Sequence, residues 1–142
     1  MSASVDRPGW KVLEIPGLMA AIGPVLSKKD ADGRFRYGVE ATDVHVNYSG
    51  VVHGGTIAAL LDQAMSLVAW HAAGRVPMVT VHMDLDFLNA AKPGDFLETV
   101  PEIREHKSSL LFVGGVVLSG ERMIAKASAI MKALKPREDG EA

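Results

Sequence analysis

A chain of 142 residues is long enough for one compact domain and short for two. Hydrophobic residues make up 48% and charged residues 23%, which excludes an intrinsically disordered chain and predicts a packed core. The formal net charge is −2 without a block of one sign, so we expect neither nucleic acid nor a membrane as a partner. The absence of cysteine excludes thiol catalysis, disulfides and Cys-ligated metals, and it suits a cytoplasmic protein.

The N-terminal part of the chain gives mixed signals. Residues 1–12 lack the apolar run of a signal peptide, so we expect no leader. Residues 10–22, interrupted by a Pro-Gly pair, predict one or two short helices that end before Pro24. Turn-forming residues at 30–33 precede an alternation of apolar and polar residues over 35–40, which predicts the first strand.

The middle of the chain carries one helix. A helix-forming run begins at Thr56 and ends before Gly74. Its apolar part, 57–73, is short for a membrane span and contains polar residues, so we interpret it as a buried helix.

Strands follow the helix. Alternating residues predict a strand at about 79–87, and three further runs separated by turns, at about 96–105, 109–118 and 122–134, predict an antiparallel meander. Pro101 in the second run predicts an edge strand or a bulge, and the Gly114-Gly115 pair predicts a close approach of a ligand or another backbone. The order of elements predicts an α+β fold in a single domain over 1–142, with its core at about 15–134 and a solvated tail at 135–142.

The predicted helix has two different faces. On a helical wheel, small residues lie within about 60° of Asp62: Ala58, Ala59, Ser66, Ala69 and Ala73. Bulky residues lie on the opposite face: Ile57, Leu60, Leu61, Leu67 and Val68. The bulky face suits burial under a sheet, and the small face suits a ligand, a partner subunit or a close backbone.

Asp62 is the only acid in the predicted helix, and it lies away from both ends. Helix geometry alone leaves two interpretations of it. In one it is a solvent-facing or hydrogen-bonded residue beside Ser66, and in the other it is a general base or nucleophile in a dry cleft.

The segment before the helix contains an adjacent glycine pair, Gly54-Gly55. Glycines at a helix start present unobstructed N–H groups beside the positive end of the helix dipole, where they can hold an oxyanion. Acyl transfer requires such donors together with a base or nucleophile.

These residues resemble the hotdog-fold acyl-CoA thioesterases, specifically the phenylacetic-acid-degradation (PaaI-like) type within the 4-hydroxybenzoyl-CoA thioesterase-like superfamily. The resemblance rests on Asn47, Gly50, the His53-Gly54-Gly55 run and Asp62, and it continues through 80–88 and 93–95. It covers roughly residues 15 to 134. It implies a hotdog fold, in which a five- or six-stranded antiparallel sheet wraps a long central helix, and hydrolysis of an acyl-CoA.

The resemblance also implies roles for these residues. The Gly54 N–H is the main oxyanion donor, with the Asn47 side chain assisting, and Asp62 comes from the neighbouring subunit as base or nucleophile. His53 either transfers a proton or, as the family pattern favours, positions the loop. Thr80 is either a hydroxyl near the catalytic water or an ordinary strand residue, and strand alternation places it on a polar face with His82, Asp84 and Asp86.

The coenzyme A contacts are the least defined part. Gly55 and Ser66 are candidate substrate contacts, and the turn near Arg104, with Lys107, Ser108 and Ser109, is a candidate contact for the pantetheine or phosphates. The five histidines lack metal-ligand spacing, so we expect no metal and no cofactor other than the coenzyme A of the substrate.

The acyl group is not defined by the sequence. Met65, Trp70, Met78 and Met83 line either an aromatic or medium-chain acyl pocket or the protein core. The resemblance implies a homodimer, and a homotetramer is consistent with it. Two other functions stay open: a hotdog hydratase or dehydratase, and a non-catalytic acyl-CoA-binding protein.

Overall fold

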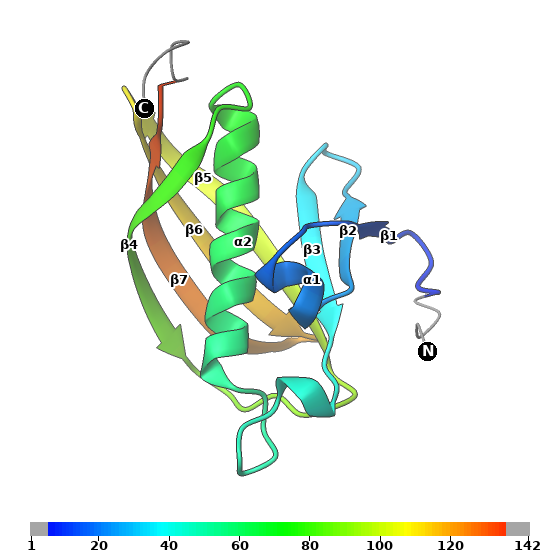
Figure 1. Ribbon diagram of the computed structural model, residues 1–142. Helices are drawn as coiled ribbons and strands as arrows, with labels where there is room; N and C mark the ends of the chain where they lie inside the picture. The colour runs from blue at the N-terminus through cyan, green and yellow to red at the C-terminus, as the bar shows by residue number, and fades with distance from the viewer. Residues whose placement is uncertain (1–5, 136–142) are drawn as a thin grey trace.

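The computed structural model describes residues 6–135, and one long helix lies in the curve of an antiparallel sheet (Figure 1). This helix is α2 (Gly54–Ala72), and the sheet has seven strands in the order β1-β2-β3-β5-β6-β7-β4. The bounds of the strands are β1 (Lys11–Leu13), β2 (Val25–Lys29), β3 (Phe35–Glu40), β4 (Met78–Phe87), β5 (Phe96–Lys107), β6 (Leu110–Ser119) and β7 (Arg122–Ala133). The prediction of an α+β fold with a helix wrapped by an antiparallel sheet is confirmed.

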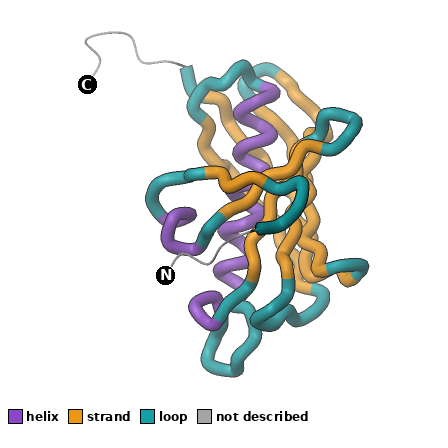
Figure 2. The backbone as a smooth tube through the Cα atoms, turned by 90° about the vertical axis from the view of Figure 1, so that its right-hand side faces the viewer, coloured by secondary structure: helices purple, strands orange, loops and turns teal. Residues whose placement is uncertain are grey.

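The N-terminal region differs from the sequence prediction. The sheet has seven strands rather than five or six, because β1 and β2 form a hairpin that extends it beyond β3, with Val12 opposite Leu26. Only α1 (Leu18–Ile22) is helical within 10–22, and Figure 2 shows this hairpin and α1 in front of α2. The sequence did not reveal these strands because their residues do not alternate; β2 is fixed by pairing with β3, and β1 by pairing with β2. The tail at 136–142 lies outside the described residues.

The helix α2 buries one face against the sheet. Its buried residues are Ile57, Leu60, Leu61, Ala64, Met65 and Ala69. The bulky face is therefore mostly buried as predicted, but Leu67 and Val68 are only half-buried, and Ala69 of the small face joins the core. Asp62 lies half-buried beside the core face. Within residues 6–135, no helix has the length and apolar character needed to span a membrane.

Pro101 lies in β5, which is an internal strand between β3 and β6, so the edge-strand prediction is wrong for β5 as a whole. The ladder between β3 and β5 ends at Tyr37 and Thr99, which leaves Pro101 beyond it with a partner on the β6 side alone. Proline is tolerated there because that edge of β5 lacks a strand to receive an N–H. The irregularity in pairing falls two residues later, between Ile103 and Glu105.

Two glycines in the sheet have side chains lying across them. The ring of Phe96 covers Gly38, and it is held in place by Trp10 at 5.0 Å and by the Arg7 guanidinium at 3.7 Å from its centroid. The Arg104 side chain covers Gly114 and donates to Ser128 Oγ at 2.7 Å. The Gly114-Gly115 pair therefore accommodates the protein's own side chains, since Gly115 faces Leu61 and Met65 of α2.

We predict that Gly38→Ala lowers the free energy of unfolding by about 1 to 3 kcal/mol, because its Cβ would overlap a ring that cannot move freely. Gly114→Ala is the matched control, since the exposed Arg104 side chain can swing away, and it should change stability by less than about 0.5 kcal/mol. Urea denaturation of both variants measures the difference. Equal losses of stability in the two variants would contradict the conclusion that the Phe96 ring is held in place over Gly38.

Candidate active site

The segment that leads into α2 is a loop closed at its base by His45. The His53 N–H donates to the His45 carbonyl oxygen at 2.8 Å, and Val46 pairs with Val52 across the loop. The His45 ring is only 4% exposed; its Nδ1 accepts from the Thr42 N–H at 2.9 Å, and its Nε2 contacts the Ile22 carbonyl oxygen. One buried ring thus fixes the loop to the end of α1.

Asn47 lies at the start of this loop and shapes it. Its Oδ1 accepts from the Ser49 N–H at 2.8 Å and from the Val51 N–H at 3.4 Å. Among the described residues, its Nδ2 has no hydrogen-bond acceptor. The side-chain oxygen is therefore used to hold the loop, and the amide N–H groups stay free to donate to a ligand.

The first turn of α2 is capped by His53. Its Nδ1 accepts from the Gly55 N–H at 2.7 Å, and its carbonyl oxygen accepts from Thr56 and Ile57. Within residues 6–135, the Gly54 N–H has no protein acceptor. Because this N–H lies at the positive end of the helix dipole, Gly54 can bind a negative oxygen there, whereas the Gly55 N–H is already occupied.

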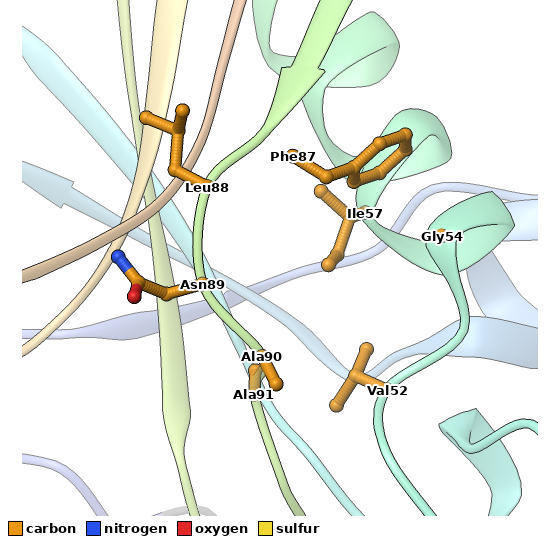
Figure 3. A pocket seen from close by; sticks show the side chains of 8 residues that line it. All are labelled: Val52, Gly54, Ile57, Phe87, Leu88, Asn89, Ala90 and Ala91. Atoms are coloured by element: carbon orange, nitrogen blue, oxygen red, sulfur yellow. The ribbon is translucent and has the colours of Figure 1, made fainter. Parts of the chain in front are cut away.

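A cavity of about 350 Å³ lies against Gly54 (Figure 3). The Phe87 ring forms its wall, and a Cβ on Gly54 would lie 3.2 Å from that ring. Figure 3 shows Phe87 and Ile57 beside Gly54, with Leu88 and Asn89 directed to the other side. Glycine at 54 therefore allows Phe87 to approach the helix start, where the ring, 55% exposed, borders the free N–H.

Asp62 accepts a hydrogen bond from the Thr80 hydroxyl at 2.6 Å, between its Oδ1 and Thr80 Oγ1. Ser66, the partner suggested by the wheel, instead donates to Met131 Sδ at 3.7 Å. The second carboxylate oxygen of Asp62 has no protein donor among the described residues. A half-buried carboxylate with one oxygen held and one free is suited to act on a water or a ligand.

A β-bulge turns Thr80 toward Asp62. In the pairing of β4 with β7, Thr80 lies opposite Met131 and His82 opposite Ile130, so Val81 is the extra residue. Thr80 therefore shares the inner face with Met83 and not the outer face with His82, Asp84 and Asp86. The expectation that alternation places Thr80 with those three residues is wrong, because the alternation breaks at Val81.

Gly54 and Asp62 are far apart within one chain. Both belong to α2, eight residues apart, which corresponds to a rise of about 12 Å at 1.5 Å per residue. A thioester carbonyl held at the Gly54 N–H is therefore out of reach of the same chain's Asp62. The chain contains both chemical groups but does not bring them to one point.

A second cavity, of about 290 Å³, begins at Gln63, directly after Asp62, and lies between α2 and the start of β4. It is lined by Gln63, Ser66, Leu67, Trp70 and Met78. Of the four side chains considered for an acyl pocket, Trp70 and Met78 are brought together here. Met65 is fully buried in the core and Met83 packs against it.

The hairpin tip at 107–109 lies far from Gly54. The Ser109 carbonyl oxygen accepts from the Ala133 N–H at 2.7 Å, and Ala133 pairs with Met78, so the tip is near the beginning of β4. Lys107, Ser108 and Ser109 are exposed there, and Ser108 has a positive φ of 58°. Arg104 lies on the outer face of the sheet, bound to Ser128 and Glu102. Residues 6–135 contain no group of three His, Asp or Glu side chains that could hold a metal ion.

Sequence reasoning missed two contributors to this site. Phe87 belongs to an alternating run that is typical of core residues, and no local pattern shows that its ring lies against Gly54. His45 fixes the loop through contacts to Thr42 and Ile22. The contact with Thr42 is local and could have been suspected from a histidine three residues after a threonine, whereas the contact with Ile22 depends on the fold.

A family model described as the thioesterase superfamily matches residues 49–126, which include Gly54, Asp62 and Thr80. The Pseudomonas aeruginosa protein named "Putative esterase PA0474" is 31% identical over 114 residues, covering 80% of this chain and 85% of that protein. This relationship extends over most of both chains.

Solved structures share the fold. A mutant of the phenylacetic acid degradation protein PaaI from Thermus thermophilus has a TM-score of 0.73 at 22% identity, covering 82% of this chain and 97% of that one. The BH2602 protein from Bacillus halodurans, solved with CoA, has a TM-score of 0.69 at 25% identity, covering 78% of this chain and 74% of that one. At 22% identity, the similarity to the PaaI mutant is evidence for a shared fold alone.

We predict that His45→Ala lowers the free energy of unfolding by about 2 to 4 kcal/mol, because it leaves a cavity and removes the partners of the Thr42 N–H and the Ile22 carbonyl. The exposed His106→Ala is the control and should stay within about 0.5 kcal/mol of the parent. Chemical denaturation gives both values. Hydrogen exchange should also rise across 46–53 in His45→Ala alone, and unchanged protection there would contradict the anchoring role.

Proposed function

The chain belongs to the thioesterase superfamily and is a thioester hydrolase, and from this premise we propose that it hydrolyses an acyl-CoA at a site shared by two copies of the chain. The observation that carries the proposal is the Gly54 N–H, which has no acceptor among the described residues and lies at the start of α2 beside a cavity. Coenzyme A as the thiol portion is supported by the Bacillus halodurans relative that was solved with CoA.

The shared site follows from the separation within α2. About 12 Å of helix lies between Gly54 and Asp62, so a carbonyl bound at the first requires a carboxylate from elsewhere. An antiparallel arrangement of two α2 helices about a twofold axis would bring each Gly54 toward the partner subunit's Asp62. The open face of α2, which includes Ala59, Leu67 and Trp70, is apolar enough for such a contact.

The edge strand β4 supports association. It is ten residues long, it pairs with β7 on one side, and the other side has no strand partner within the described chain. Val79, Val81 and Phe87 are exposed along it, at 42%, 57% and 55%. A long strand edge left open is prone to pair with another chain, so we propose a homodimer with β4 at its centre, and a tetramer of such dimers is consistent with it.

In the proposed reaction, the Gly54 N–H and the Asn47 amide donate to the thioester oxygen as it becomes negative. Asp62 of the second copy either removes a proton from water, which then attacks the carbonyl carbon, or attacks that carbon itself to give an anhydride that water cleaves. In both routes the C–S bond breaks and the coenzyme A thiolate leaves and takes up a proton. The Thr80 hydroxyl orients Asp62 by holding its Oδ1.

The remaining candidates have lesser roles in this proposal. His53 positions the glycines, since its Nδ1 is occupied by the Gly55 N–H. Lys107, Ser108 and Ser109 stay candidates for the nucleotide part of coenzyme A, because they are exposed near the beginning of β4. We propose a cytoplasmic enzyme, for which the support is the absence of cysteine.

The acyl group is proposed to enter the cavity between α2 and β4. That cavity begins at Gln63, directly after Asp62, and is lined by Trp70 and Met78. Its volume of about 290 Å³ is about twice that of an apolar cavity known to hold benzene, about 150 Å³, so one aryl ring or a medium-length chain fits. The Trp70 side chain offers an aromatic face to such a group.

Two other functions make different predictions. A hotdog hydratase or dehydratase would use a histidine paired with an acid at its site, but the His53 ring contacts Gly55 and no carboxylate among the described residues. His82 does pair with Asp84 at 3.1 Å, but both side chains are exposed on the outer face of β4. A non-catalytic acyl-CoA-binding protein would bind the same ligands without hydrolysis. An assay of thiol release from acyl-CoA substrates separates both from the proposed enzyme.

We predict that Asp62→Ala lowers kcat for acyl-CoA hydrolysis by at least ~100-fold, the scale expected when a catalytic base is removed. Asp32→Ala is the control and should keep parental activity, because Asp32 is an exposed carboxylate in the turn between β2 and β3, away from α2 and β4. Hydrolysis is followed through reaction of released coenzyme A with a thiol reagent. Equal rates for the parent and Asp62→Ala would exclude Asp62 as the catalyst.

Mixing variants tests the shared site directly. Gly54→Val and Asp62→Ala are each expected to be nearly inactive, yet refolding them together should restore about a quarter of parental activity, since half of randomly formed dimers are mixed and each has one intact site of two. Mass spectrometry of the intact dimers confirms that mixed dimers form. Mixed dimers without activity would show that each site lies within one chain.

A change at the acyl cavity should alter substrate preference. We predict that Trp70→Ala lowers the kcat/KM ratio of phenylacetyl-CoA to acetyl-CoA about tenfold, because the aryl group loses its aromatic wall. Trp70→Phe keeps an aromatic face and should change the ratio less than about threefold. An unchanged ratio in Trp70→Ala, with hydrolysis intact, would place the acyl group elsewhere.

A further inference from the structure

A cavity of about 520 Å³ lies on the side of α2 away from Asp62, between the C-terminal half of the helix and strands β3 and β5. Its walls are formed by Phe35, Tyr37, Val68, His71, Pro101 and Ile103. His71 follows Asp62 by nine residues, which is two and a half helical turns, so the two side chains leave α2 on opposite sides. Figure 1 shows β3 and β4 on opposite sides of α2, and the cavity is on the β3 side.

Tyr37 supplies the one hydrogen-bonding side chain in the walls of this cavity that is deeply buried. The residue is 5% exposed, and among residues 6–135 its hydroxyl has no hydrogen-bond partner and is accessible to solvent. Its backbone is fixed, because its carbonyl oxygen accepts from Thr99 Oγ1 at 2.9 Å across to β5. Burial raises the pKa of the Tyr37 hydroxyl to about 12, so this group stays a donor throughout the neutral range.

Flat rings form one wall of the cavity. The Phe35 and His71 rings stack with centroids 5.4 Å apart and planes 4° apart, and Phe35 and Tyr37 lie 6.4 Å apart at 14°. Three nearly parallel rings on two different elements make a rigid surface. Such a surface favours a planar aromatic ligand over a branched aliphatic one, because flat rings gain contact area without distortion.

Exposed charged residues lie around the mouth, and the Lys29 ammonium is 5.5 Å from the centroid of the Phe35 ring. Arg34 contacts Asp32 at 3.5 Å, and Glu102 contacts Arg104 at 3.3 Å, all four being exposed to solvent. These charges stay in solvent, whereas a charged ligand inside the cavity would bury its charge against apolar walls. The cavity therefore selects for an uncharged molecule.

We propose that this cavity binds a small, uncharged, planar aromatic molecule whose carbonyl or ether oxygen accepts a hydrogen bond from the Tyr37 hydroxyl. Phe35 and Ile103 contact the ring of the ligand from β3 and β5, and Val68 contacts it from α2. The site is separate from the one around Gly54 and Asp62, and it does not depend on the proposed hydrolysis of acyl-CoA.

Acetophenone is a suitable probe, because it is planar and uncharged and carries one carbonyl oxygen. Ethylbenzene is its matched control, since it has a similar shape without an acceptor. With the valine and isoleucine methyl groups labelled, acetophenone should shift the NMR signals of Val68 and Ile103 saturably, with a dissociation constant of about 1 mM or tighter. The Ile57 methyl, which borders the Gly54 cavity, should not shift.

Two variants test the contacts. Tyr37→Phe keeps the ring and removes the hydroxyl, so it should weaken acetophenone about fivefold to tenfold and leave ethylbenzene unchanged. Ala72→Trp, at the exposed mouth, should block both probes while the core stays intact. Equal affinity of acetophenone for the parent and Tyr37→Phe would overturn the proposal, as would shifts that do not saturate or that appear at Ile57.

Discussion

The rise of the α-helix governs how this protein can work. Gly54 begins α2 and Asp62 lies two turns later, and the regular hydrogen bonding of the helix holds them about 12 Å apart. No rotation of side chains closes that distance. The proposed chemistry therefore depends on a second copy, and the other features of the chain serve that arrangement: an open face on α2, an edge strand without a partner, and a carboxylate held on the β4 side.

The parts of the fold that local patterns define were predictable. The helix expected from Thr56 to before Gly74 is Gly54–Ala72, and the four later strands lie within a few residues of their predicted bounds. Their periodicity is strong because each buries one face against the same core. The strands β1 and β2 were not predictable in this way, since they are short and their residues do not alternate. They form only through pairing, β2 with β3 and β1 with β2.

The candidate site likewise contains residues that a local sequence motif reveals and residues whose positions depend on the folded chain. Gly54, Asn47 and His53 belong to one continuous motif that the sequence reveals, and the structure shows a free N–H at Gly54, a loop held by the Asn47 side-chain oxygen and a helix capped by His53. Their catalytic roles stay predictions. The orientation of Thr80 was beyond sequence reasoning, because a period of two cannot reveal that Val81 is an extra residue. Contacts between distant segments, such as Phe87 on Gly54, are likewise properties of the folded chain.

The open edge of β4 has a consequence for how the enzyme would behave in dilute solution. When two chains each provide half of a site, the fraction of working sites follows the law of mass action. Specific activity would then fall as the protein is diluted below the dissociation constant of the dimer, and substrate that bridges both subunits would favour assembly. Hydrolysis would thereby be tied to the abundance of the chain itself, so that doubling a scarce protein would more than double the rate.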